Sequence, residues 1–169
     1  MAGTAEVISR MERTPAARYP VLVPNLKGFN NLLEVLSQHA SSSYSTPPPT
    51  NEIAIFTAAT EAFAQANTNC SIADSLERLR TVSQAALDKG MRVRGYISVV
   101  ITCPYSGKAD YTKVRDITKE LLDMGCYEVS LGDTTGTGNP HSISEMLETV
   151  TSTVPVEKLA VSLPLSISR

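Results

Sequence analysis

The sequence predicts an α/β fold in which about five parallel strands alternate with helices. Short apolar segments recur along the chain, and amphipathic helical patterns lie between them. Turn residues bound both kinds of segment. Segments that alternate in this way form parallel strands joined by right-handed helical crossovers.

The predicted strands are continuous apolar runs, which is typical of strands that are covered on both faces. We therefore expect each strand to be buried along its length. The five runs are Tyr19–Val23, Glu52–Phe56, Val93–Ile101, Tyr127–Leu131 and Leu159–Leu163.

Helices are predicted from apolar stripes and from residues that favour helix ends. The expected helices lie at about residues 26–39, 59–67, 71–90, 110–125 and from 142 onward. Ser71 is a suitable N-cap, and Gly90 and Gly125 are suitable stop residues. Ser142 and Glu145 have the spacing of a capping box after Pro140.

The number of strands is too small for a closed barrel. A (β/α)₈ barrel takes roughly 250 residues, whereas this chain has 169. We therefore predict one partial TIM-barrel domain over residues 1–169, with the barrel not closed. A five-stranded doubly wound domain also fits this length and stays as the alternative, although no GxGxxG motif follows the first strand. The Ser/Pro-rich stretch 41–51 is predicted to be an exposed insertion.

Charge and hydropathy exclude several classes of function. Lys and Arg number 15 against 17 Asp and Glu, so the net charge of −2 favours neither a nucleic acid nor a membrane surface as partner. The longest apolar runs are too short to span a bilayer. The first twenty residues resemble neither a secretory signal nor a mitochondrial presequence, so the chain as written is expected to be cytoplasmic.

The cysteines and histidines are few and widely spaced. Cys70, Cys103 and Cys126 form no CxxC pair, which argues against a disulfide framework or a zinc knuckle. His39 and His141 lie in separate segments, so no metal site is predicted from this chain. No histidine is near Cys103 in the sequence, and a buried or inert thiol is expected there.

Both candidate folds bind ligands at the carboxyl ends of their strands. Asn25 follows the first predicted strand, and Tyr96 lies within the third. The fourth strand ends in SLGDTTGTGNP, where Ser130 precedes Asp133 and Thr134. Two interpretations of this segment stay open: a carboxylate aimed into a pocket beside a glycine-rich loop, or a helix-entry loop whose aspartate caps the next helix.

Taken in order, these segments resemble the 3-hydroxy-3-methylglutaryl-CoA lyase family. The matching stretches are YPVLVPNLKGF, IAIFTAATEAFAQANTNCSIADSLERL, VRGYISVVITCPYSGK and MGCYEVSLGDTTGTGNP. The resemblance covers most of residues 18–161 without the insertion, and residues 162–169 are predicted to be a non-homologous tail.

The resemblance implies a TIM-barrel enzyme that cleaves 3-hydroxy-3-methylglutaryl-CoA to acetyl-CoA and acetoacetate in leucine degradation and ketone-body formation. It implies an acyl-CoA substrate, Mg²⁺ or Mn²⁺ as the metal and the mitochondrial matrix as the compartment. A metal of this kind polarises the substrate oxygens while a base removes the hydroxyl proton. By resemblance, Asp133 and Tyr96 are catalytic, and Asn25, Ser130 and Thr134 bind substrate.

Other residues that the family uses have no match in this sequence. The first strand of the family carries an Arg-Asp pair, and a later strand ends in a metal-binding His-x-His-Asp motif. The chain has Ser162, Leu163, Pro164 and Leu165 at that motif. The family's metal-binding Asn and its Gly-Gly-Cys-Pro loop with a catalytic Cys also find no match. We therefore expect a chain truncated at both ends relative to the family, inactive alone and without a bound metal.

Three alternatives remain from the sequence. The chain could be a fragment of an isopropylmalate-synthase-like condensing enzyme, which needs the same metal-binding histidines. It could be a non-catalytic half-barrel that associates with an intact homologue or with another copy of itself. It could also be an unrelated doubly wound binding domain.

Overall fold

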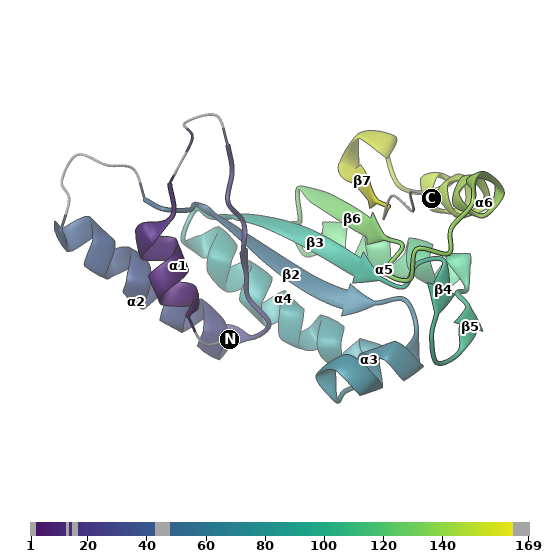
Figure 1. Ribbon diagram of the computed structural model, residues 1–169, viewed down its shortest axis with the longest axis horizontal. Helices are drawn as coiled ribbons and strands as arrows, with labels where there is room; N and C mark the ends of the chain where they lie inside the picture. The colour runs from purple at the N-terminus through teal and green to yellow at the C-terminus, as the bar shows by residue number, and fades with distance from the viewer. Residues whose placement is uncertain (1–2, 13, 15–16, 43–47, 164–169) are drawn as a thin grey trace, which may run out of the picture.

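The computed structural model describes residues 3–12, 14, 17–42 and 48–163 of the chain. Five strands form one parallel sheet: β1 (Val21–Leu22), β2 (Glu52–Ala58), β3 (Arg92–Ser98), β6 (Glu128–Gly132) and β7 (Leu159–Ser162). Their spatial order is β1-β2-β3-β6-β7, which is also their order along the chain (Figure 1). Within the described residues β1 and β7 each pair with one neighbour, so the sheet is open and the prediction of an unclosed barrel is confirmed.

The five predicted helices are also confirmed. They are α2 (Leu26–Ser42), α3 (Glu61–Thr68), α4 (Ile72–Asp88), α5 (Tyr111–Asp123) and α6 (Pro140–Thr151). The sequence did not predict α1 (Thr4–Arg10), the hairpin of β4 (Thr102–Cys103) and β5 (Gly107–Lys108), or the 3₁₀ turn η1 (Val156–Lys158). Each of these is too short to show a periodic apolar pattern, which is why periodicity alone did not reveal it.

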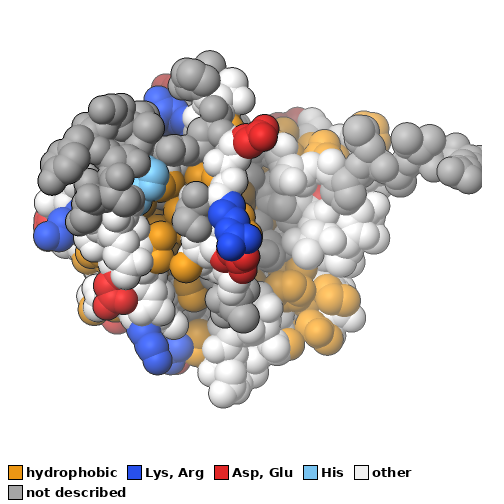
Figure 2. Space-filling view, turned by 60° about the vertical axis from the view of Figure 1, so that its left-hand side comes forward, with side chains coloured by type: hydrophobic (Ala, Val, Ile, Leu, Met, Phe, Trp, Pro, Cys, Tyr) orange, Lys and Arg blue, Asp and Glu red, His pale blue; other side chains and the backbone are white. Residues whose placement is uncertain are grey.

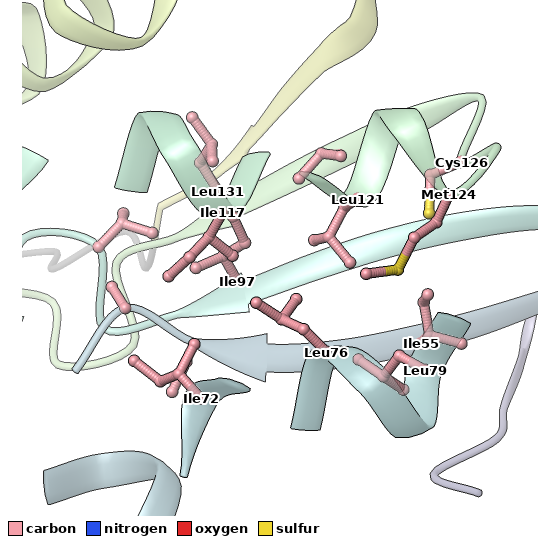
Figure 3. Close-up of a cluster of buried hydrophobic side chains, with 14 of the residues drawn as sticks. Ile55, Ile72, Leu76, Leu79, Ile97, Ile117, Leu121, Met124, Cys126 and Leu131 are labelled. Carbon is pink, nitrogen blue, oxygen red and sulfur yellow. The ribbon is translucent and has the colours of Figure 1, made fainter. Parts of the chain in front are cut away.

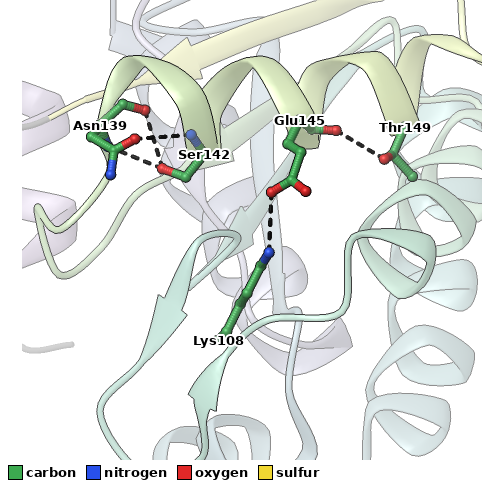
Figure 4. A network of polar contacts seen from close by, with 5 residues as sticks. All are labelled: Lys108, Asn139, Ser142, Glu145 and Thr149. Atoms are coloured by element: carbon green, nitrogen blue, oxygen red, sulfur yellow. Dashed lines mark hydrogen bonds and ion pairs between the residues drawn. The ribbon is translucent and has the colours of Figure 1, made fainter.

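The predicted capping box of α6 is wrong. The helix begins at Pro140 and not at Ser142, because proline favours the first helical position and Asn139 before it is the N-cap. Asn139 Oδ1 accepts a hydrogen bond from Ser142 N at 3.0 Å, and Ser142 Oγ accepts one from Asn139 N at 3.0 Å. Glu145 instead forms an ion pair with Lys108 at 3.1 Å (Figure 4).

The core lies between one face of the sheet and the helices. Ile55 of β2, Ile97 of β3 and Leu131 of β6 all point to this side, as the strand register requires. The helices meet them with buried side chains (Figure 3), namely Leu76 and Leu79 of α4 and Ile117 and Leu121 of α5. Burying such side chains is worth about 1.5–3 kcal/mol each, so this layer holds the strand ends in place.

The opposite face of the sheet is polar on β3 and β6. Burial on both faces was predicted for every strand. It is confirmed at most positions of β2 and at the centre of β6, but it is wrong for β1 and β7, which have no buried residue, and for β3. There Val93, Gly95 and Ile97 are buried, whereas the alternate residues Arg94 and Tyr96 are only half-buried. This pattern is the one expected of a strand with a single apolar face.

Strand β3 is also shorter than predicted, because it ends at Ser98 although the apolar run continues to Ile101. Val99 has φ of +56°, a left-handed conformation that terminates a strand. Residues 99–101 remain fully buried, so the apolar character of the run reports burial and not strand structure.

Two further predictions fall partly outside the described residues. Of the Ser/Pro-rich stretch, residues 41–42 belong to α2, residues 43–47 lie outside the described part, and Pro49 and Thr50 are buried. Of the predicted tail, Ser162 ends β7 and residues 164–169 lie outside the described part. The insertion and the tail therefore stay predictions.

Candidate functional site

The sequence-predicted site residues meet at the carboxyl ends of β3 and β6. Tyr96 and Ser130 are register partners on these neighbouring strands and lie on the same polar face of the sheet. Asp133 and Thr134 follow directly after β6. In a parallel α/β sheet this edge is where ligands bind. Four of the five predicted site residues therefore lie together.

Asp133 is a buried carboxylate with defined hydrogen-bond partners. Asp133 is only 4% exposed. Asp133 Oδ2 accepts a hydrogen bond from the backbone N–H of Gly138 at 2.8 Å, and its backbone N–H donates to Ser162 O at 3.0 Å. Thr135 Oγ1 lies 3.5 Å from the other carboxylate oxygen, Oδ1. An ionised carboxylate has about four acceptor positions, so Asp133 retains capacity for a ligand.

The structure contradicts one of the two interpretations of the glycine-rich segment, the one in which Asp133 caps the next helix. The N-cap of α6 is Asn139, so Asp133 is not the helix cap. Residues 134–138 instead turn back so that Gly138 faces the carboxylate. A Cβ on Gly138 would lie 2.8 Å from Asp133 Oδ2, which shows how closely the backbone approaches it. The loop therefore positions a carboxylate at the strand ends.

Thr134 connects this loop to the end of β3. Its Oγ1 accepts a hydrogen bond from the backbone N–H of Val99 at 2.9 Å. Thr135 makes a parallel contact, because its Oγ1 lies 3.3 Å from the carbonyl oxygen of Thr102 at the start of the β4–β5 hairpin. The sequence did not predict these contacts, since they join two loops that are about thirty-five residues apart.

The β4–β5 hairpin places Cys103 next to the site. The predicted burial of Cys103 is confirmed, as the residue is 2% exposed. Burial raises the pKa of the thiol, but hydrogen bonds from the Ser106 and Thr60 hydroxyls and from the Tyr105 and Ser106 backbone outweigh it and lower the pKa to about 7. At Cys126, by contrast, burial alone raises the pKa to about 12.

Asn25 lies apart from the other four residues. It follows β1, which is separated from β3 by β2, and its side chain is exposed. Asn25 Oδ1 accepts a hydrogen bond from Gly28 N at 2.9 Å, in the first turn of α2. It also lines a cavity of about 350 Å³ between α1 and α2, together with Lys27 and Leu32. The structure thus brings Asn25 to the same edge of the sheet but not into contact with Asp133.

A second polar cluster lies at the opposite, amino-terminal ends of the strands. Glu52 is 1% exposed and accepts a hydrogen bond from the Tyr127 hydroxyl at 2.6 Å. Burial, and then the hydrogen bond to Glu52, raise the pKa of Tyr127 to about 12. Arg94 pairs with Glu128 on the neighbouring strand, and the Arg92 guanidinium lies 3.7 Å from the centre of the Tyr127 ring. In barrels, this end of the strands serves stability and not catalysis.

A metal centre is not found in the described part of the chain. No group of three or more His, Cys, Asp or Glu side chains lies together there as a metal site would need. On the face drawn in Figure 2, basic and acidic side chains are interspersed and no patch of a single charge gathers. None of the described helices has the length and apolarity needed to cross a bilayer.

Comparison with known proteins assigns the family. A model of the family described as HMGL-like matches residues 37–164. The chain belongs to the HMGL-like family. It is 48% identical over 160 residues to the Pseudomonas aeruginosa 3-hydroxy-3-isohexenylglutaryl-CoA/hydroxymethylglutaryl-CoA lyase, covering 95% of this chain and 49% of that protein.

Relatives from animals and solved structures agree with this assignment. The mitochondrial hydroxymethylglutaryl-CoA lyase of Bos taurus is 45% identical, and the cytoplasmic 3-hydroxy-3-methylglutaryl-CoA lyase of Mus musculus is also 45% identical. This chain covers 46% of the first and 43% of the second, and each alignment covers 95% of this chain. The crystal structure of the Pseudomonas aeruginosa hydroxymethylglutaryl-CoA lyase superposes with a TM-score of 0.84 at 47% identity, covering 96% of this chain and 50% of that one.

This HMGL-like chain therefore spans about half the length of the curated relatives it matches. The superposition confirms the partial-barrel prediction over the doubly wound alternative. The family generally depends on a divalent metal and acts on acyl-CoA substrates. Its relatives include mitochondrial and cytoplasmic forms.

Proposed function

We propose that this chain forms part of an active site that cleaves 3-hydroxy-3-methylglutaryl-CoA to acetyl-CoA and acetoacetate. Asp133 and Tyr96 are its catalytic residues, and Asn25, Ser130 and Thr134 bind the acyl-CoA substrate. The observation that supports this most is the buried carboxylate of Asp133 directly after β6, the strand on which Ser130 lies opposite Tyr96 of β3, within a segment 48% identical to a lyase of this type.

The chemistry requires a proton acceptor and hydrogen-bond donors. Cleavage removes the proton of the 3-hydroxyl group, breaks the adjacent carbon–carbon bond and leaves the electron pair on the carbon next to the thioester. The ketone product is acetoacetate, and protonation of the enolate yields acetyl-CoA. Asp133 accepts a hydrogen bond from the substrate hydroxyl, while the Tyr96 and Ser130 hydroxyls donate to substrate oxygens.

The metal of the family is Mg²⁺ or Mn²⁺, which would polarise the hydroxyl and carbonyl oxygens of the substrate. The described residues bring together no ligand set for such an ion. The positions that match the family's His-x-His-Asp motif begin with Ser162 and Leu163. We propose that the chain alone binds no catalytic metal and has no lyase activity. We propose the mitochondrial matrix as the compartment of the whole enzyme, and the name of the bovine relative, which is mitochondrial, supports this.

A chimera tests the proposal directly. Residues 18–161 of this chain would replace the matching segment of the Pseudomonas aeruginosa lyase, and acetoacetate release would be measured with Mg²⁺. We expect lyase activity from the chimera and none from the chain alone. The Asp133→Asn chimera should lose about 10²- to 10⁴-fold in kcat, the usual contribution of a general acid or base. A chimera that folds, as judged by its thermal melt, but has no activity would contradict the proposal.

A second candidate is a non-catalytic half-barrel that associates with an intact homologue or with another copy of itself. The observation that favours it is the open sheet, because β1 and β7 are edge strands within the described residues. Co-purification of the tagged chain with the Pseudomonas aeruginosa lyase would support it. The relatives described above are named lyases, which favours a lyase over a condensing enzyme.

A further inference from the structure

Val99 adopts a backbone conformation that is unfavourable for its side chain. Its φ is +56°, and a β-branched residue in the left-handed region is a genuine outlier. Such a conformation is energetically costly and persists only where surrounding contacts enforce it. Val99 is fully buried and lies between β3, which carries Tyr96, and the β4–β5 hairpin, which carries Cys103.

The contacts that enforce this conformation come from β6 and the loop after it. Thr134 Oγ1 accepts the hydrogen bond from Val99 N at 2.9 Å, and Gly132 O accepts one from Val100 N at 3.2 Å. The Thr134 hydroxyl itself lies 3.5 Å from Gly132 O, to which it can donate. The bond from Val99 N fixes the peptide plane before Val99, and the bond from Val100 N fixes the peptide plane after it, so the two contacts together define the backbone conformation of Val99.

We propose that Thr134 is a positioning residue whose hydroxyl holds Val99 in the left-handed conformation and so fixes the hairpin of residues 102–108 beside Asp133. The hairpin is held at two further points, by Thr135 at Thr102 and by the Lys108–Glu145 ion pair. Those contacts lie further along the hairpin, whereas Val99 sets the direction in which the chain leaves β3. The relevance of this hairpin to catalysis rests on the proposed lyase function, but its placement does not.

Two substitutions at position 134 distinguish the effect of the hydroxyl from the effect of side-chain size. Thr134→Val keeps the shape but leaves the buried N–H of Val99 without its acceptor, which is costly. The backbone at Val99 then relaxes toward the extended region, and the hairpin moves with it. Thr134→Ser retains the hydroxyl and should retain the hairpin position.

Cys103 reports the hairpin position in the chain as it stands. It is buried while the hairpin is closed, so it reacts with a thiol reagent only when the hairpin opens. The rate of iodoacetamide modification of each cysteine would be followed by mass spectrometry at pH 8. We expect the Cys103 rate to rise about tenfold or more in Thr134→Val and to stay near the wild-type rate in Thr134→Ser.

Two comparisons make the result decisive. Cys126 is buried in the core, so its rate should not change; equal acceleration of Cys103 and Cys126 would mean general loosening and would overturn the proposal. Thr134→Ser keeps the hydroxyl, so an acceleration of Cys103 in Thr134→Ser as large as that in Thr134→Val would also overturn it.

The chimeric lyase separates positioning from substrate binding. The proposed substrate contact of Thr134 predicts a raised KM in Thr134→Val, and the positioning role predicts in addition a lower kcat that Thr134→Ser restores. A raised KM with unchanged kcat would overturn the positioning role. An inactive parent chimera would refute the proposed function, and the Cys103 rates in the original chain would still decide the role of Thr134.

Discussion

The backbone of Gly138 holds the carboxylate of Asp133 in place. The N–H of Gly138 donates to Asp133 Oδ2 at 2.8 Å, and a Cβ at position 138 would approach the same oxygen to 2.8 Å. It would also lie 3.2 Å from Ile143 Cδ1. Asp133 is buried, so its carboxylate has little space to move into, whereas Ile143 is partly buried and packs against the core.

Gly138→Ala is therefore expected to displace the Asp133 carboxylate. Inserting a methyl group into a packed site costs about 1–3 kcal/mol, and the displaced carboxylate should lower kcat of the chimeric lyase more than it raises KM. Thermal unfolding and steady-state kinetics of the chimera measure the two effects. His141→Ala, at an exposed position nearby on α6, should change neither. An unchanged kcat in Gly138→Ala would show that the loop does not position Asp133.

Part of the site could be predicted from single residues and part could not. Tyr96, Ser130 and Asp133 were expected to lie together because parallel strands bring their carboxyl ends to one edge. The partner of Thr134 could not be predicted, since the contact depends on how two loops pack. The lowered pKa of Cys103 has the same origin, because Thr60 comes from before α3 and Ser106 from the hairpin.

Among the elements, α6 shows how helix-end signals compete. Asn139 and Ser142 are both good N-cap residues that precede an apolar stripe, and Glu145 lies three residues after Ser142. Pro140 resolves the competition, because its fixed φ suits the first helical position and it has no N–H to satisfy. A capping box of Asn139 with Ser142 and one of Ser142 with Glu145 predict different losses of stability on substitution of Asn139 and of Glu145.

Asn139→Ala should destabilise the protein by about 1 kcal/mol, the usual loss for a removed N-cap side chain. For a domain of this size the midpoint of thermal unfolding should fall by about 2–4 °C. Glu145→Ala is the matched control, since it removes only an exposed ion pair with Lys108, worth about 0–1 kcal/mol. Thermal melts of both variants measure the difference, and a larger loss in Glu145→Ala would restore the capping box expected from the sequence.

The other elements were predicted to the extent that their signals are local. The stripes of α4 and α5 and the stops at Gly90 and Gly125 depend on residues close in sequence, and all were confirmed. The hairpin of β4 and β5 was missed because two-residue strands carry no pattern. The predicted end of β3 was wrong because the apolar run continues past the strand, and Val99 is buried without strand geometry.

At the scale of the whole molecule, the parallel sheet is open at both of its edges. In the described part of the chain β7 hydrogen-bonds to β6 on one side only, and β1 to β2 on one side only. Edge strands present unpaired N–H and C=O groups that can pair with another chain. β7 is the better candidate for such pairing, because it is four residues long and Val161 within it is 39% exposed.

We expect the isolated chain to self-associate through this edge. Val161→Lys should shift the chain toward monomer, because a lysine on an edge strand opposes pairing with a further strand. Val156→Lys is the matched control: Val156 is 69% exposed but lies in η1, outside the sheet. Sedimentation velocity over a concentration series measures the distribution in each case. If both variants dissociate the assembly, or if neither does, the contact between chains is made elsewhere. The β7 edge would then not be the surface through which this half-barrel associates.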